Sequence, residues 1–290
     1  MKNYKSLEKY LQEKECKDLI PNYDTDAWTR LRPWNFVYDK LFIADSQQLP
    51  CGPWGTYPNK YPIIIKPIIN LFGMSRGFRL IKSEKEYQAI DNADGHLWEE
   101  YLTGDNMTID LIIINGQIKD YYPIRSIPDD NGSFKYHETL LEYRISDRII
   151  VWIANYLSDY VGVINMEIIG SYIIEMHLRL NNDFYYDDIF VDQLIEFYKS
   201  GNYIVKPNIR KKQQIFFFPI FITKEQFENT EFENNKKKVI KLLDEQDLVK
   251  SIRWFNLNSL SQWVYLRLLT FEAYSLSEGL AIKLMIKRLL

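Results

Sequence analysis

The stretch that most constrains the fold is residues 61–77, YPIIIKPIINLFGMSRG. Two prolines bracket a run of three isoleucines, which is too short for a helix and is typical of a buried strand. The strand delivers Lys66 to its end, and Gly73 and Gly77 then bound a loop whose backbone N–H groups can turn toward a phosphate. A basic side chain beside such a loop is one way to hold a triphosphate, although many hairpins also carry two glycines.

Composition and charge describe an ordinary globular protein with one large domain or two modest ones. Of the 290 residues, 46% are hydrophobic and 26% are charged. The chain has 36 lysines and arginines against 39 aspartates and glutamates, which gives a formal net charge of −3. This balance argues against general nucleic-acid binding but leaves room for a local basic patch.

Cysteine usage and hydropathy bear on the compartment. The two cysteines, Cys16 and Cys51, lie far apart and in no CxxC pattern, which indicates a reducing compartment without a disulfide framework or a zinc site. The charged N-terminal segment lacks the apolar core of a signal peptide, and no apolar run approaches the ~20 residues that span a bilayer. We therefore expect a cytoplasmic protein with no membrane association.

Hydrophobic periodicity and turn residues predict the secondary structure. We expect helices over residues 1–19, 35–48, 83–90 and 148–160, and antiparallel hairpins over 107–122 and 161–180. We expect irregular polar or turn-rich segments over 20–34 and 127–147. After residue 186, an aromatic strand (215–222) precedes a charged helical stretch (223–250) and an amphipathic last helix. That last helix either packs on the core, which we favour, or forms a homodimer contact.

Polar side chains gather on the second predicted hairpin. One face of its first strand carries Asn165 and Glu167, and one face of its second strand carries Glu175, His177 and Arg179. Because an apolar strand does not bury such groups without partners, a cation or a ligand would explain them. Magnesium bound to a nucleotide needs only one or two protein carboxylates. A solvent-facing strand surface with a few salt bridges explains the same pattern.

The order of these features resembles that of the ATP-grasp superfamily, in particular its carboxylate–amine ligases such as the D-alanine–D-alanine ligases. The resemblance covers about residues 38–183 and rests on several motifs in the family's order and near its spacing. The motifs are YDK at 38–40, QLPCGP at 48–53, PIIIKP at 62–67, GMSRG at 73–77, WEEYLTG at 98–104 and IIEMHLR at 173–179.

The resemblance implies an α+β ATP-grasp fold, in which two lobes hold ATP between them. Relative to the family, the N-terminal domain is truncated and a C-terminal region is added. The implied divisions are a helical N-terminal segment (1–60), a small lobe (61–103), a large lobe with the metal site (104–185) and a C-terminal α/β extension (186–290).

The resemblance also implies a set of residues that contact ATP. These are Lys40 and Lys66 at the α- and β-phosphates, Gly73, Met74, Ser75 and Gly77 in the phosphate loop, Glu99, Glu100, Tyr101 and Leu102 at the adenine, and Asp105 or Asn106 at the ribose. The two lysine cations would offset phosphate charge in a cleft of low dielectric, where electrostatic stabilisation counts most. Without the family context, the two adjacent glutamates are a pair of exposed charges at a strand end.

Further residues are implied at the metal ion and at the reacting groups. Glu167 and Glu175 would bind Mg2+, and His177 stands where the family has an asparagine, which leaves the number and geometry of bound ions open. Arg76 in the phosphate loop would contact the γ-phosphate. Two more arginines, Arg125 and Arg179, are candidates for the acylphosphate and the acceptor carboxylate, because a guanidinium holds such oxygens bidentately. The first of these two is equally compatible with a surface strand arginine.

The implied reaction is ATP-dependent ligation of a small-molecule or peptide carboxylate to an amine, or to a similar nucleophile, through an acylphosphate. Since Lys40 comes so early in the chain, part of the usual substrate pocket must come from residues 186–290 or from a partner subunit. Two alternatives stay open, an ATP-grasp kinase that phosphorylates a small molecule and a nucleotide-binding protein without turnover.

Overall fold

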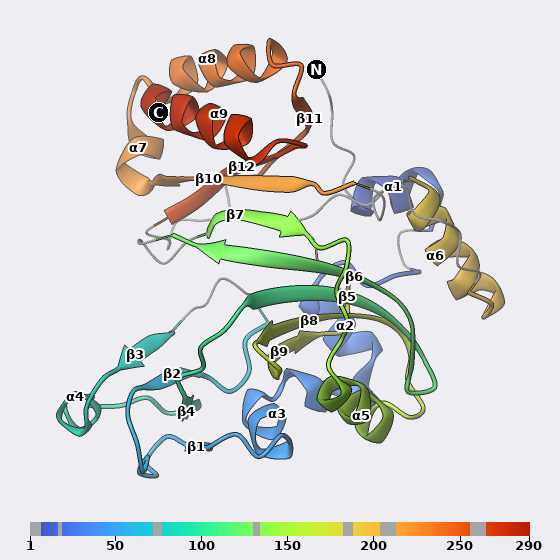
Figure 1. Ribbon diagram of the computed structural model, residues 1–290, viewed down its shortest axis with the longest axis vertical. Helices are drawn as coiled ribbons and strands as arrows, with labels where there is room; N and C mark the ends of the chain where they lie inside the picture. Colours follow the sequence, from blue (N-terminus) through green and yellow to red (C-terminus); the bar gives the residue numbers. More distant parts are fainter. Residues whose placement is uncertain are drawn as a thin grey trace.

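Antiparallel strands form two sheets of unequal size (Figure 1). The computed structural model describes residues 7–16, 19–71, 77–129, 134–181, 188–203, 213–255 and 265–290. Within these ranges, the smaller sheet has four strands in the order β1-β4-β2-β3, and the larger has eight in the order β11-β12-β10-β7-β6-β5-β8-β9.

The smaller sheet contains the isoleucine strand that the sequence predicted. Its strands are β1 (Cys51–Pro53), β2 (Ile63–Pro67), β3 (Arg79–Ile81) and β4 (His96–Glu100), and α4 (Glu84–Gln88) follows β3. The isoleucines of β2 are at most 6% exposed, and two of them pack with Tyr87 and Trp98 in a small core. Ser83 caps α4 by accepting a hydrogen bond from the Glu86 backbone N–H.

The larger sheet is built from hairpins. Its strands are β5 (Asn106–Ile114), β6 (Gln117–Pro128), β7 (Phe134–Thr139), β8 (Val161–Ile169), β9 (Tyr172–His177), β10 (Phe216–Thr223), β11 (Val249–Trp254) and β12 (Tyr265–Ala273). Asn115 and Gly116 both have positive φ at the β5–β6 turn, which suits the tight turn of a two-residue hairpin. Both predicted hairpins are confirmed, because β5 pairs with β6 and β8 pairs with β9.

Helices cover both faces of the larger sheet. One face of β5 and β8 packs against α5 (Asp147–Tyr156) in the largest core cluster. On the opposite face, Ile112, Tyr122 and Phe217 pack against α1 (Leu7–Glu13) and α6 (Asp188–Ser200). At the far end, α8 (Phe232–Asp244) and α9 (Leu276–Leu289) pack on β10, β11 and β12 (Figure 1). The last helix thus packs on the core, as we favoured.

Several predicted boundaries differ from the structure. Residues 35–48 do not form one helix, because Asp39 caps a new one, α3 (Lys40–Ser46), after the 3-10 helix η1 (Arg32–Tyr38). The segment 20–34 contains α2 (Asp24–Arg30), and 127–147 contains β7. The stretch 223–250 is broken into α7 (Lys224–Glu228) and α8 and ends in β11.

The region after residue 186 continues the larger sheet. Strand β10 pairs with β7 through Phe216 and Glu138 and through Phe217 and His137, and β12 and β11 follow outward. The C-terminal strands therefore share one sheet with the predicted large lobe, while the domain boundaries themselves remain predictions. Within the described parts of the chain, no helix is both long enough and apolar enough to cross a membrane.

Candidate functional site

Lys66 connects the two sheets. It lies on β2 next to β4, and its Nζ is 2.7 Å from Oε1 of Glu99. The same Nζ donates a hydrogen bond of 2.9 Å to the backbone carbonyl of Ile174 on β9. Both charged side chains are about nine-tenths buried or more, with 11% and 6% exposure. The predicted phosphate-binding lysine thus lies at the junction of the sheets, in a buried ion pair.

Lys40 reaches the same junction from another element. It is the first residue of α3, and its backbone N–H donates to the carbonyl of Ile68, just after β2. Its Nζ lies 3.0 Å from Oε1 of Glu175, and its side chain is only 5% exposed. Helix α3 contacts the edge strand β9, which brings this lysine beside the metal-ligand candidates (Figure 1).

The three metal-ligand candidates meet on β8 and β9. Glu167 and Glu175 lie opposite each other, and His177 lies opposite Asn165 on the same pair of strands. One ligand atom from each of the three candidates lies within 4.8 Å of the others. Carboxylate oxygens are the preferred ligands of Mg2+, so the donor set fits a divalent cation.

The two carboxylates differ in their electrostatic surroundings. Burial raises the pKa of Glu167, and the neighbouring charge of Glu175 raises it further. Burial also acts to raise the pKa of Glu175, but the charges of His177 and Lys40 outweigh burial, so its pKa is lowered. Glu175 is therefore the more readily ionised ligand of the pair.

Asp24 completes the site and was not predicted from the sequence. Its Oδ1 lies 3.0 Å from Nδ1 of His177, and its Oδ2 accepts a 2.7 Å hydrogen bond from Arg179. Oδ1 also accepts from the Tyr38 hydroxyl at 3.1 Å. Burial alone would raise the pKa of Asp24, but the hydrogen bond and charge of His177, together with Arg179, lower it to about 2. No local sequence pattern identifies this contact, because Asp24 and His177 are 153 positions apart.

A second buried network supports the strand that carries Glu167. The Asn165 side-chain amide donates to Thr108 Oγ1 at 2.9 Å and to Asp110 Oδ1 at 3.0 Å. The backbone N–H of Asn181 donates to the same Asp110 oxygen at 2.8 Å. Sequence analysis singled out only Asn165 of these residues. The others lie on β5 and after β9, so only the strand pairing reveals them.

The residues predicted to contact the adenine lie on a segment that runs from β4 to β5 and is called the hinge below. Glu99 is buried, whereas its neighbour Glu100 is exposed, so the two glutamates are not equivalent. Tyr101 donates its backbone N–H to the Pro62 carbonyl at 3.2 Å, and Leu102 follows it.

The end of the hinge packs on the turn between β8 and β9. Gly104 has φ +138°, and a Cβ there would lie 3.1 Å from the Gly170 backbone. The backbone carbonyl of Asp105 accepts a hydrogen bond from the Gly170 N–H, while its side chain is exposed, and Asn106 begins β5.

The phosphate loop and Arg125 are the other predicted groups. The phosphate-loop residues Gly73, Met74, Ser75 and Arg76 lie outside the described residues, and the loop's last residue, Gly77, has φ +74°. The other group is Arg125, which lies opposite Met107, whereas Glu167 lies opposite the next residue along β5. Since side chains alternate along a strand, the arginine points to the other face of the sheet. There its Nε donates to Glu138 at 2.7 Å.

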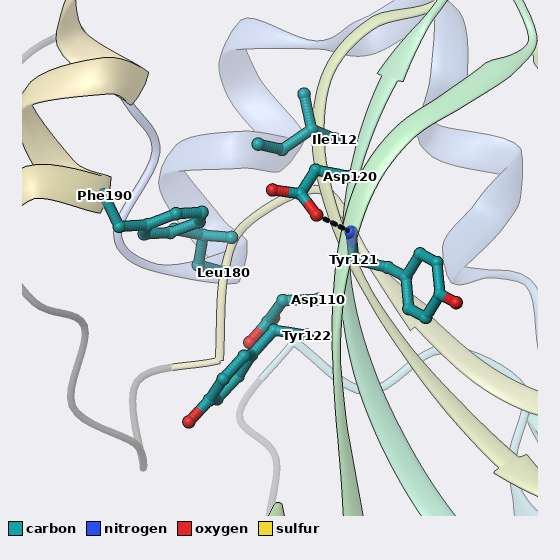
Figure 2. Close-up of a pocket in the computed structure, with 7 residues that line it drawn as sticks. All are labelled: Asp110, Ile112, Asp120, Tyr121, Tyr122, Leu180 and Phe190. Carbon is teal, nitrogen blue, oxygen red and sulfur yellow. Dashed lines mark hydrogen bonds between the residues drawn. The ribbon is translucent and has the colours of Figure 1, made fainter. Parts of the chain in front are cut away.

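A small pocket lies along the larger sheet, close to the Asn165 network (Figure 2). Its walls come from β5, β6, the segment after β9 and α6, and its lining residues are Asp110, Ile112, Asp120, Tyr121, Tyr122, Leu180 and Phe190. Asp120 accepts hydrogen bonds from the Tyr121 backbone N–H and the Tyr203 hydroxyl. The pocket shares Asp110 with the network but contains neither of the two lysines nor any of the metal-ligand candidates.

Sequence comparison and structure comparison give different results. No family model matches the chain, and no curated protein sequence matches it. Among solved structures, the chain is similar to the L-amino acid ligase from Bacillus licheniformis, with a TM-score of 0.56 and 12% identity over 88% of this chain and 71% of the ligase.

Two further structures contain nucleotides. The carboxyaminoimidazole ribonucleotide synthase from Aspergillus clavatus, complexed with ATP, gives a TM-score of 0.58 at 10% identity, over 90% of this chain and 74% of that one. The biotin carboxylase domain of the Hydrogenobacter thermophilus 2-oxoglutarate carboxylase, in complex with MgADP, gives 0.51 at 13% identity, over 83% and 62%.

These neighbours are ATP-grasp ligases, and at such identities the likeness establishes the fold alone. It agrees with the mixed architecture of helices and two sheets described above. The chain therefore has the ATP-grasp fold, as its motifs predicted.

Proposed function

We propose that this protein is an ATP-dependent ligase that joins a carboxylate to an amine, or to a similar nucleophile, through an acylphosphate. The observation that carries the proposal is the meeting of two buried lysines with three metal-ligand candidates at the junction of the two sheets. The neighbours in the structure comparison, which include an L-amino acid ligase and nucleotide complexes, support this class of reaction.

The lysines would bind the phosphates of ATP. Each is paired with a carboxylate, Lys40 with Glu175 and Lys66 with Glu99, in surroundings that are largely shielded from water. A triphosphate at the junction offers these ammonium groups stronger anionic partners, because interactions between charges are strengthened in low dielectric. Lys40 would then release Glu175, whose oxygen becomes available to a metal ion. The phosphate loop, with Gly73, Met74, Ser75 and Gly77, would close over the same phosphates.

Glu167, Glu175 and His177 would hold Mg2+. When bound, the ion supplies positive charge that neutralises the phosphate oxygens as the γ-phosphoryl group transfers. At the hinge, the Glu99 carboxylate would accept a hydrogen bond from the adenine amino group. The backbone of Tyr101 or Leu102 would contact the purine edge, and Asp105 or Asn106 would hold the ribose.

The chemistry needs no protein nucleophile. A carboxylate oxygen of the acid attacks the γ-phosphorus, the bond to the β-phosphate oxygen breaks, and ADP leaves. The amine nitrogen then attacks the acylphosphate carbon, loses a proton, and displaces inorganic phosphate. Catalysis rests on positioning and on charge stabilisation. Of the arginine candidates, Arg179 lies beside the metal-ligand candidates through Asp24, which favours it over Arg125 for a substrate carboxylate, and Arg76 remains a prediction for the γ-phosphate.

The test is ADP release from Mg-ATP with a pooled panel of acids and amines, followed by mass spectrometry of the products. A product with the mass of acid plus amine minus water identifies a ligase and its substrates. That product should disappear in Lys66→Ala and in Glu175→Ala. The matched control is Lys85→Ala, an exposed lysine on α4, which should leave turnover unchanged.

Two outcomes contradict the proposed reaction, and a third contradicts the assignment of the site. A mass gain of one phosphate on an acceptor, without use of an amine, identifies a kinase instead. Tight ATP binding without any product from a broad panel identifies a nucleotide-binding protein without turnover. Unimpaired turnover in both Lys66→Ala and Glu175→Ala would contradict the assignment of the site.

A further inference from the structure

The imidazole of His177 is fixed by a buried carboxylate. Its Nδ1 lies 3.0 Å from Oδ1 of Asp24, and the two side chains are 5% and 4% exposed. Asp24 is itself held by Arg179 at 2.7 Å and by the Tyr38 hydroxyl at 3.1 Å. Tyr38 in turn accepts a hydrogen bond from the Leu178 backbone N–H at 3.1 Å, directly after β9. The ring orientation is therefore determined by a connected set of hydrogen bonds.

This arrangement selects one nitrogen of the ring as a possible metal ligand. With Nδ1–H donating to Asp24, the ring nitrogen that can offer a lone pair to a metal ion, in place of a proton, is Nε2. Nε2 is on the side of Glu175, 3.7 Å from its Oε1, which is longer than a hydrogen bond. Glu167 adds a third donor atom within 4.8 Å of the others. A carboxylate that orients a metal-binding histidine through its other nitrogen is a common arrangement in metalloproteins.

The donor set bears on the choice of ion. Mg2+ is a hard cation that binds oxygen ligands and keeps several waters, whereas imidazole suits first-row transition metals. A site with two carboxylates and one oriented imidazole therefore gains more from a transition-metal ion than from Mg2+. Mn2+ is the appropriate probe because it accepts carboxylate oxygens, phosphate oxygens and imidazole alike.

We propose that this site binds a first-row divalent transition-metal ion such as Mn2+ in preference to Mg2+, through Nε2 of His177, with Asp24 as the residue that positions the ring. The inference rests on the proposed function only in taking Glu167, Glu175 and His177 as ligands of one ion.

The test is a Mn2+ titration followed by electron paramagnetic resonance, with Mg2+ as competitor, on the whole protein with and without ADP. The bound Mn2+ should show magnetic coupling to an imidazole nitrogen. In His177→Asn this coupling should vanish, and Mn2+ should bind at least about 10-fold more weakly, while Mg2+ affinity changes by less than about 3-fold.

A second variant tests the positioning role. Asp24→Asn should weaken Mn2+ binding by about 10-fold, because the ring loses its anionic partner, but should retain the nitrogen coupling. The matched control is Asp26→Asn, two residues along the same helix, where the carboxylate is 40% exposed and pairs with Arg30. Its Mn2+ affinity should equal that of the unchanged protein. Circular dichroism establishes that each variant is folded.

The inference is overturned if the unchanged protein shows no nitrogen coupling in either condition, or if His177→Asn keeps the same ratio of Mn2+ to Mg2+ affinity. Failure of the proposed function is a separate result, measured as ATP binding and product formation. A protein that binds Mn2+ through nitrogen but forms no product refutes the ligase and leaves the metal preference standing. A ligase whose bound Mn2+ shows no nitrogen coupling supports the proposed function and refutes the metal preference.

Discussion

Breaking the buried ion pair between Lys66 and Glu99 should cause a large loss in the free energy of unfolding. The ammonium of Lys66 contacts the Glu99 carboxylate and the Ile174 carbonyl. Replacing Glu99 by glutamine leaves this ammonium buried without its carboxylate partner. At the 2.7 Å separation of the two atoms, the attraction is about 6 kcal/mol at an effective dielectric constant of about 20. Most of it offsets the desolvation of the two charges, yet removal of one partner of a buried pair costs about 3–5 kcal/mol. Because glutamine keeps a hydrogen-bond acceptor, we expect a loss of about 3 kcal/mol.

The assay is a double-mutant cycle by urea unfolding, monitored by tryptophan fluorescence. Trp98, which lies on β4 beside Glu99 and is 8% exposed, is one of seven tryptophans that contribute to this signal. The variants are Glu99→Gln, Lys66→Met and the two combined. We expect the double variant to lose at least about 2 kcal/mol less than the sum of the single losses, because neither charge remains buried alone.

The control cycle uses an exposed ion pair. Lys224 and Glu228 form a contact of 3.6 Å with side chains that are 52% and 61% exposed. Lys224→Met and Glu228→Gln should couple by less than about 0.5 kcal/mol, because water screens the pair. Additive losses in the Lys66 and Glu99 cycle, or a single variant that costs less than about 1 kcal/mol, would refute the reasoning that burial makes this pair costly to break.

Three further predictions test other parts of the fold by urea unfolding. Gly104→Ala should cost about 2 kcal/mol more than Gly95→Ala. Both glycines have positive φ, but only the Cβ added at 104 would lie close to backbone, 3.1 Å from Gly170. Equal losses would contradict this. Gln47→Leu should cost about 2–4 kcal/mol, because the Gln47 side-chain amide hydrogen-bonds to both the N–H and the carbonyl of Ile173. An unchanged free energy of unfolding would show that these backbone groups find other partners. Burial, aided by Lys287, lowers the pKa of Lys283 to about 8 from 10.5, so the unfolded chain binds more protons between these values and stability rises with pH across that window. Relative to Lys283→Met, the unchanged protein should therefore gain about 2 kcal/mol between pH 7 and pH 9.5, and an equal pH dependence of the two would refute this.

Local patterns predicted the elements that depend on neighbouring residues. The isoleucine run of β2 and the alternation along β8 and β9 are properties of short segments, because side chains on a strand repeat every two residues. For the same reason, Asn165 and Glu167 could be placed on one face of their strand, and Glu175 and His177 on one face of theirs, before the pairing that joins the two sets was known. The helix over 35–48 was wrong because a cap at Asp39 starts a new helix within it, and the capping hydrogen bond to Phe42 is a local signal that hydrophobic periodicity does not register.

The contacts that complete the site depend on the tertiary structure. Asp24 reaches His177, and Lys66 reaches Ile174, over more than a hundred positions of sequence, so no periodicity relates them. The face on which Arg125 lies is likewise set by its register with β5. The sequence by itself determined β2, the hairpins over 107–122 and 161–180, and the resemblance to the ATP-grasp ligases. Only the tertiary structure decided which charges pair, because an ion pair or an oriented imidazole needs side chains from separate elements within about 3–4 Å, and packing alone brings them there.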